Sequence, residues 1–196
     1  GSCYPLFAAN PERYIAYIAP PIVYANIGVD FGGGTSGHAF QCVGFTFRMS
    51  EMVVLEEYFN QSALDPQTLE REFVDFVERC KAKYTISEVY CDSAEQTLIN
   101  GLRQAASSAG LGVNIGDARK RAINDRIRAT LLLMGSGRFV ISRDCPQTIS
   151  ALKDALWDGR HETEDVRLDD GTTNIDSLDS LEYSFEREIP NLIAGW

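Results

Sequence analysis

Apolar residues alternate with polar or small ones along three successive stretches near the start of the chain. The stretches cover residues 25–31, 39–48 and 53–59, and in the first of them Ile27 and Val29 lie two positions apart. A period of two is typical of β-strands, and short connections join antiparallel neighbours. The pattern therefore predicts a three-stranded antiparallel meander.

A helical period replaces this alternation after residue 64. Asp65 is a good N-cap, Pro66 suits the first helical turn, and Leu69, Phe73 and Phe76 follow at helical spacing. Further helices are predicted over 95–109 and 123–134, from 146 onward, and from a cap at Asn174 or Asp176 to Pro190. Short extended segments are predicted at 88–91, 112–116 and 139–141.

The order of these elements favours one architecture. Strands separated by a helix run parallel with a right-handed crossover, so the strand at 88–91 is expected beside the first strand and parallel to it. Three meandering strands followed by alternating helices and strands resemble the ribonuclease H-like fold. We therefore expect an α/β protein with a mixed sheet, a three-stranded antiparallel meander plus parallel strands, flanked by helices.

Length and proline content suggest how the chain is divided. A chain of 196 residues suits one domain with a substantial core. Four prolines fall among aromatic residues before residue 25, namely Pro5, Pro11, Pro20 and Pro21. We interpret residues 1–24 as an irregular N-terminal arm or the remnant of a linker, and residues 25–196 as the folded domain.

Composition excludes several classes of protein. No apolar run approaches the roughly 20 residues that span a bilayer, and nothing resembles a signal peptide, so we expect neither membrane insertion nor secretion. Five widely spaced cysteines without a C-x-x-C pair, together with only two histidines, argue against a zinc site or a disulfide framework. Buried thiols in a reducing cytoplasm are the better interpretation.

Net charge argues against nucleic acid as a partner, because the chain carries -10 and phosphate binding relies on Lys and Arg. Bound divalent cations would neutralise part of this acidity. The basic residues are also concentrated, with five of them in ten positions: Arg119, Lys120, Arg121, Arg126 and Arg128. This segment is either a phosphate-binding surface or a solvated helix face.

Aspartates occupy the positions where a metal site would form. Asp30 ends the first strand and Asp92 follows the fourth, so parallel pairing brings them to the same carboxyl edge of the sheet. On the last helix, Asp176, Asp179 and Tyr183 share one face because they are three and four residues apart. Clustered carboxylates repel one another unless a cation lies among them, and Mg²⁺ or Mn²⁺ prefers such ligands. A pair of these ions about 4 Å apart serves phosphodiester hydrolysis.

Three segments resemble the nuclease motifs of the phage large terminase family. They are IGVDFG at 27–32, VYCDSAE at 89–95 and NIDSLDSLEY at 174–183, and the resemblance extends over nearly all of the chain from residue 25 to 188. It implies the carboxyl-terminal nuclease domain, which cuts concatemeric double-stranded viral DNA during genome packaging. Asp30, Asp92 and Asp179 match the metal-binding acids, for two Mg²⁺ or Mn²⁺ ions. Asp176 is a further candidate ligand, at a position where related sequences often have histidine.

The resemblance also implies partners. In the resembled family a basic residue in this region holds a DNA phosphate, so Lys120 either has that role or is a surface residue. Arg121 and Arg126 lie in the same basic segment. Other implied partners are the ATPase domain of the same full-length protein, the small terminase subunit and the portal, in the cytoplasm of a bacterial host. The sequence contains no G-x-x-x-x-G-K-[ST], so this chain carries no ATPase phosphate loop.

Structural roles compete with these assignments. Asp92 could cap the helix that follows it, Asp176 could cap the last helix, and Asp179 could be a first-turn acid favoured by the helix dipole. His38, and Asp169 with Asp170, are within reach of the expected site but are more typical of ordinary loop polarity.

Other functions remain open to test. The glycines at 32, 34 and 37 match a dinucleotide fingerprint, but a strand pattern rather than a helix follows them. The same segment resembles a phosphate loop of the actin and sugar-kinase superfamily, which needs about twice this length. Two alternatives share the ribonuclease H-like fold: a Holliday-junction resolvase or integrase-like nuclease, and a docking module that does not cut.

Overall fold

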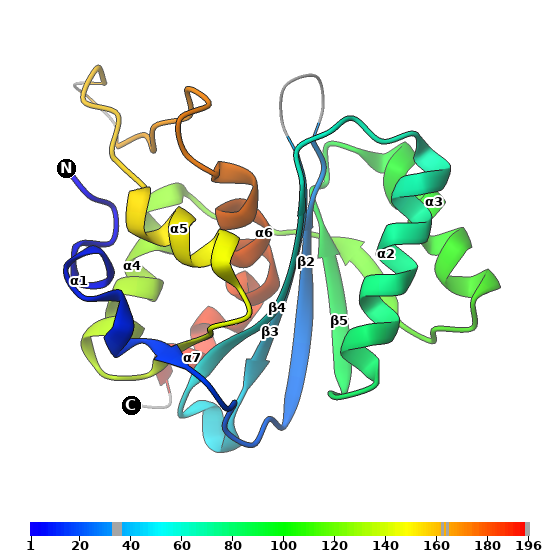
Figure 1. Ribbon diagram of the computed structural model, residues 1–196, viewed down its shortest axis with the longest axis horizontal. Helices are drawn as coiled ribbons and strands as arrows, with labels where there is room; N and C mark the ends of the chain where they lie inside the picture. Colours follow the sequence, from blue (N-terminus) through cyan, green and yellow to red (C-terminus); the bar gives the residue numbers. More distant parts are fainter. Residues whose placement is uncertain (33–36, 162, 164, 195–196) are drawn as a thin grey trace.

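A single mixed sheet forms the centre of the computed structural model, which describes residues 1–32, 37–161, 163 and 165–194 (Figure 1). Seven described strands pair in the order β1-β7-β4-β3-β2-β5-β6. Their bounds are β1 Ile15–Ala16, β2 Tyr24–Asp30, β3 His38–Phe45, β4 Met52–Asn60, β5 Ile86–Cys91, β6 Asn114–Asp117 and β7 Phe139–Ser142.

The pairing of the strands confirms the expected topology. β2, β3 and β4 form the antiparallel meander, and β5 lies parallel to β2 on its other side. β6 extends the sheet parallel to β5, while β7 pairs parallel with β4 and β1 pairs parallel with β7. The fold is therefore the predicted α/β class with a mixed sheet flanked by helices.

Helices cover both faces of the sheet (Figure 1). α2 and α3 lie on one face, and α1, α4, α5, α6 and α7 lie on the other. Their bounds are α1 Pro5–Ala9, α2 Pro66–Lys81, α3 Gln96–Ser108, α4 Ile123–Gly135, α5 Pro146–Asp154, α6 Ile175–Phe185 and α7 Ile189–Ala194, with 3-10 turns η1 Pro11–Arg13, η2 Phe47–Met49 and η3 Glu186–Glu188. Two apolar cores result, one on each face of the sheet.

The start of the chain differs from the irregular arm that its prolines suggest. Pro5 and Pro11 each stand in the first turn of a helix, α1 and η1, where the missing amide hydrogen costs nothing. Tyr4 and Phe7 are buried in the core beside α4 and α5, and β1 is an edge strand of the sheet. This segment packs as part of the described fold.

Two other local expectations change. The second strand ends at Phe45 rather than at residue 48, because η2 follows, in which Arg48 and Met49 have left-handed φ angles of 59° and 57°. Pro190 does not end the last helix: α6 ends at Phe185 and, after η3, Pro190 stands in the first turn of α7. The polar segment after α5 is tied down by an antiparallel bridge between Trp157 and Arg167.

The cysteines lie in the core of this fold. All five cysteines are buried and free, as the interpretation of them as core residues predicts. Among the described residues, no helix has the length and apolar character needed to cross a membrane.

Close packing of α6 on β2 positions the end of the chain over the centre of the sheet. A Cβ atom on Gly28 would lie 1.8 Å from the carbonyl oxygen of Ser180, so only glycine permits this approach. Ser177, Ser180 and Ser184 are fully buried where α6 meets the sheet. Small residues on both elements therefore set the distance between α6 and β2.

Candidate metal centre

Two aspartates meet at the carboxyl edge of the parallel pair β2 and β5. Val29 lies opposite Cys91 in the register, and the amide of Asp92 donates a hydrogen bond of 3.0 Å to the carbonyl of Val29. Asp30, the last residue of β2, and Asp92, the first residue after β5, consequently stand side by side. The predicted strand pairing is confirmed, and with it the juxtaposition of these two acids.

The N-terminal half of α6 brings two more carboxylates, Asp176 and Asp179, to the same place. Asn174 is the N-cap, since its side chain accepts a hydrogen bond of 3.0 Å from the amide of Ser177. Asp176 is therefore not the cap, and its Oδ2 instead accepts a hydrogen bond of 3.0 Å from the amide of Gly37. Asp176 and Asp179 both act on Asp30 electrostatically, so the face predicted for the acids is turned toward the end of β2.

Asp30 is the most perturbed acid of this group. It is only 5% exposed, and burial together with the neighbouring Asp179, a hydrogen bond with Asp176 and the charge of Asp92 raises its pKa to about 10. A buried carboxylate among like charges is stabilised by a proton or by a cation. The environment of Asp30 is the kind that a divalent ion relieves.

Asp179 lies between acids and arginines. Burial raises its pKa to about 7, with further upward contributions from Glu182 and Asp176 that the charges of Arg167 and Arg126 oppose. Arg167 donates to Asp179 Oδ1 over 2.6 Å, and Arg126 Nη1 lies 3.7 Å from the same oxygen. This carboxylate is thus held by arginine at one end.

A buried ion network lies beneath the acids. Arg167 also donates to both carboxylate oxygens of Glu182, each over 2.9 Å, and Glu182 is only 1% exposed. Arg126 lies 3.3 Å from Glu182 and 3.5 Å from Glu186, which is fully buried. Arg167, Glu182 and Glu186 were not predicted as site residues from the sequence. Glu182 and Glu186 are four positions apart and adjoin the apolar positions of the last helix, and this spacing was the one sequence signal that could have indicated their burial.

Lys120 lies on the other side of the cluster and forms an ion pair with Asp92. Its backbone has a left-handed φ of 55°, which is uncommon outside glycine. Glu186 fixes this conformation, because its two oxygens accept the amides of Lys120 and Arg121 over 2.8 and 3.2 Å. The structure therefore brings Lys120 to the acids, while the guanidinium of Arg126 is turned inward into ion pairs.

His38 and the acidic loop before α6 lie near the cluster. Burial lowers the pKa of His38, the nearby Asp176 opposes this shift, and its Nδ1 accepts the amide of Gly32 over 3.1 Å. Asp169 and Asp170 line a polar pocket of about 780 Å³ that also reaches Asp176. Of the glycine-rich segment, residues 33–36 lie outside the described residues; β3 follows that segment, as the period of two predicts.

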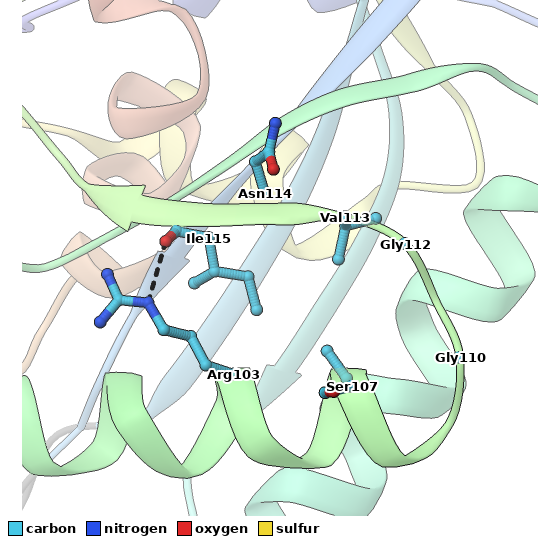
Figure 2. Close-up of a pocket in the computed structure, with 8 residues that line it drawn as sticks. Arg103, Ser107, Gly110, Gly112, Val113, Asn114 and Ile115 are labelled. Atoms are coloured by element: carbon cyan, nitrogen blue, oxygen red, sulfur yellow. Dashed lines mark hydrogen bonds between the residues drawn. The ribbon is translucent and has the colours of Figure 1, made fainter.

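A second pocket, of about 510 Å³, lies between α3 and β6 (Figure 2). Figure 2 shows Arg103 reaching from α3 to the strand, where its Nε donates a hydrogen bond of 3.1 Å to the carbonyl of Ile115. None of the four clustered aspartates lines this pocket.

The donor set of the cluster suits a hard cation, because carboxylate oxygens are the ligands that Mg²⁺ and Mn²⁺ prefer. In the described part of the chain, no three His, Cys, Asp or Glu side chains are close enough to enclose a metal ion as they stand. Asp92 is paired with Lys120 and Asp179 with Arg167, so cations of the chain itself hold these acids. The residues therefore fit a metal by their chemistry.

Comparisons with known proteins identify the architecture. No protein-family profile and no curated protein matches the sequence. The structure is similar to the large terminase from a thermophilic bacteriophage, with a TM-score of 0.75, 18% identity, and coverage of 93% of this chain and 44% of that one. It is also similar to the large terminase nuclease domain from bacteriophage SPP1 with bound Mn, with a TM-score of 0.62, 20% identity, and coverage of 84% and 86%.

A third similar structure is the large terminase nuclease from the thermophilic phage G20c with bound magnesium, with a TM-score of 0.60 and 12% identity. The match covers 95% of this chain and 97% of that nuclease. This chain thus spans less than half of the large terminase matched first but nearly all of an isolated nuclease domain. The protein has the fold of the large terminase nuclease domain.

Proposed function

We propose that this protein is a divalent-metal-dependent endonuclease that cuts concatemeric double-stranded viral DNA during phage genome packaging. The observation that carries the proposal is the meeting of four aspartates at one sheet edge, with Asp30 buried among the other three. Structures of the same fold are large terminase nucleases with bound Mn or magnesium. These likenesses support a nuclease role for this chain.

Asp30, Asp92 and Asp179 would hold the ions, with Asp176 as a further candidate ligand. Asp30 occupies the central position, because the charges of all three other acids reach it. When bound, two Mg²⁺ or Mn²⁺ ions would supply a water nucleophile and neutralise charge on the scissile phosphate. The chain contributes fixed carboxylates on two parallel strands and one helix, which hold the reacting groups in place.

Lys120 is the basic residue best placed to receive DNA. Its side chain is 38% exposed and already paired with Asp92, so a backbone phosphate that approaches the acids also approaches this ammonium. Arg121 follows it on the same fixed loop. Arg126 contributes in another way, since it pairs with the buried Glu182 of α6 and Glu186 of η3 rather than facing solvent.

The wider assignments also belong to this proposal. The protein would act with an ATPase domain of the same full-length protein, the small terminase subunit and the portal, in the cytoplasm of a bacterial host. Two functions on the same fold compete with it. A Holliday-junction resolvase would prefer branched DNA, and a docking module would not cut at all.

The test is cleavage of supercoiled plasmid in EDTA, Mg²⁺ or Mn²⁺, with wild type, Asp30→Asn and Asp144→Asn compared. Asp144 is an exposed aspartate, 75% accessible, remote in sequence from the cluster, and its variant is the matched control. We expect cutting only with metal, unchanged in Asp144→Asn and lower by several powers of ten in Asp30→Asn, where each tenfold loss corresponds to about 1.36 kcal/mol.

Three results would count against the proposal. Undiminished cutting by folded Asp30→Asn would remove the acid cluster from the chemistry. No cutting under any condition would favour the docking module. Faster cutting of a four-way junction than of linear duplex would favour the resolvase.

A further inference from the structure

The two arginines beside Asp179 contact the same carboxylate oxygen. Arg167 Nη2 lies 2.6 Å from Oδ1, and Arg126 Nη1 lies 3.7 Å from that atom. Among the described residues, Oδ2 of Asp179 has no hydrogen bond or ion pair. The carboxylate is therefore oriented, with one oxygen occupied by guanidinium groups and the other left for a different ligand.

Arg167 is itself held rigidly. Its side chain is 4% exposed, and its two terminal nitrogens each donate to an oxygen of Glu182 over 2.9 Å. The hydroxyl of Tyr4 lies 3.4 Å from Arg167 Nη1 and 3.4 Å from Glu182. The planar guanidinium thus bridges Glu182 and Asp179 in a fixed geometry that a flexible ammonium would not reproduce.

The backbone around Arg167 is tied down as well. Arg167 pairs with Trp157 in an antiparallel bridge, and hydrogen bonds on either side join Asp158 to Val166 over 2.7 Å and Leu168 to Leu156 over 2.8 Å. The polar segment between α5 and α6 therefore delivers one buried arginine to α6.

We propose that Arg167 is a positioning residue for metal binding, which holds Asp179 by Oδ1 so that Oδ2 is presented to the ion. This inference rests on the proposed function, because it requires that Asp179 is a ligand. Groups that orient a ligand without touching the metal commonly affect metal affinity by 10- to 100-fold.

The opposite effect would follow if Arg167 merely competed with the metal for Asp179. Removing a competitor strengthens metal binding, whereas removing a positioning group weakens it. The geometry favours positioning, because Arg167 uses only one oxygen of Asp179 and both oxygens of Glu182. The sign of the change in affinity therefore separates the two roles.

The experiment is calorimetric titration of Mn²⁺ into the protein without DNA, for wild type, Arg167→Lys and Arg160→Lys. Arg167→Lys keeps the charge beside Glu182 but loses the fork. Arg160 lies in the same segment, is 76% exposed and pairs with Asp158 rather than with Asp179 or Glu182, so its variant is the matched control. We expect Mn²⁺ binding at least about tenfold weaker in Arg167→Lys and unchanged in Arg160→Lys.

A double-mutant cycle shows whether Arg167 acts through Asp179. In an Asp179→Asn background, Arg167→Lys should change Mn²⁺ affinity no further, whereas a general structural weakening would add to the loss. If thermal unfolding shows that Arg167→Lys is not folded, Glu182→Gln is measured instead. That variant weakens the contact that holds the Arg167 guanidinium on the Glu182 side, while Arg167 and Asp179 are both kept.

The outcomes are distinguishable from failure of the nuclease proposal. If wild type neither binds Mn²⁺ nor cuts, the proposed function is wrong and this inference falls with it. If wild type binds and cuts while Arg167→Lys binds Mn²⁺ equally well or more tightly, only the positioning role is wrong. Additive losses in the cycle would also overturn it.

Discussion

Gly28 of β2 lies directly beneath the backbone of Ser180 in α6, so closely that a methyl group there would stand 1.8 Å from the Ser180 carbonyl oxygen. The two other contacts shorter than 3 Å are also with backbone atoms of α6, which cannot move aside as a flexible side chain can. The same helix carries Asp176 and Asp179. The separation of α6 from β2 therefore also sets the separation of these acids from Asp30.

Gly28→Ala should displace α6. We expect the free energy of unfolding to fall by about 1–3 kcal/mol, the usual effect of overpacking, and Mn²⁺ binding to weaken because the acids move apart. Urea denaturation and calorimetry measure the two effects. Gly116→Ala in β6 is the control, since nothing lies within 4 Å of its added Cβ. Equal stability of the two variants would show that α6 shifts without cost.

Stability in EDTA should depend on pH through Asp30. Its pKa is about 10 in the folded protein and about 4 in an unfolded chain, so between these values the folded state binds the extra proton. The free energy of unfolding must then fall as pH rises from about 4 toward 10, and Asp179, with a pKa of about 7, adds to the fall at lower pH.

Urea denaturation of wild type and Asp30→Asn at pH 5, 7 and 9 tests this dependence. We expect Asp30→Asn to lose less stability as pH rises, so that its advantage over wild type grows toward pH 9. Added Mg²⁺ should reduce that advantage by stabilising the wild-type carboxylates. Parallel curves for the two proteins would show that Asp30 does not retain its proton on folding.

Lys120→Ala should weaken DNA binding and reduce its salt dependence. Loss of one phosphate contact lowers the slope of log affinity against log salt by about 0.9. Fluorescence anisotropy in EDTA, where the DNA stays intact, measures the slope. Lys153→Ala, in α5, is the matched lysine control. Identical slopes for Lys120→Ala and wild type would indicate that Lys120 contacts no phosphate and that the basic segment is a solvated surface.

Asp176 and Asp179 can be ranked by substitution. We expect Asp179→Asn to lower the cutting rate about a hundredfold or more, equivalent to ~2.7 kcal/mol, and Asp176→Asn to lower it less. Asn174 caps α6 in either variant, so both should keep the helix. Plasmid nicking at saturating Mg²⁺ gives the rates. The reverse ranking would make Asp176 the principal ligand on α6.

Sequence periodicity was sufficient for the parts of the site that depend on backbone pairing. The alternation around Ile27 and Val29 marked β2, and the helix between β4 and β5 required a parallel return, which placed Asp92 beside Asp30. Such inferences succeed because strand pairing and crossover handedness leave few arrangements. Helical spacing placed Asp176 and Asp179 on one face of the last helix, and the resemblance to the terminase motifs favoured Asp179 over Asp176.

Features that depend on tertiary packing were not predictable in this way. The sequence places Arg126 in a basic segment typical of a surface. Its side chain nevertheless turns inward, because Glu182 and Glu186 are buried beneath it. The role of Arg167 depends on a partner twelve residues away across a loop. Pro5 and Pro190 were misjudged for a related reason, since a proline that breaks a helix interior is equally suited to a first turn.

The sheet is longest at its centre and shortest at its margins. Its outermost described strands are β1, with two residues, and β6, with four, while β3 and β4 in the interior have eight and nine. Unpaired backbone groups at a sheet margin invite strands of other molecules to add on, and very short margins limit this. The described fold therefore offers little template for intermolecular β-pairing, which favours solubility when many copies are crowded together.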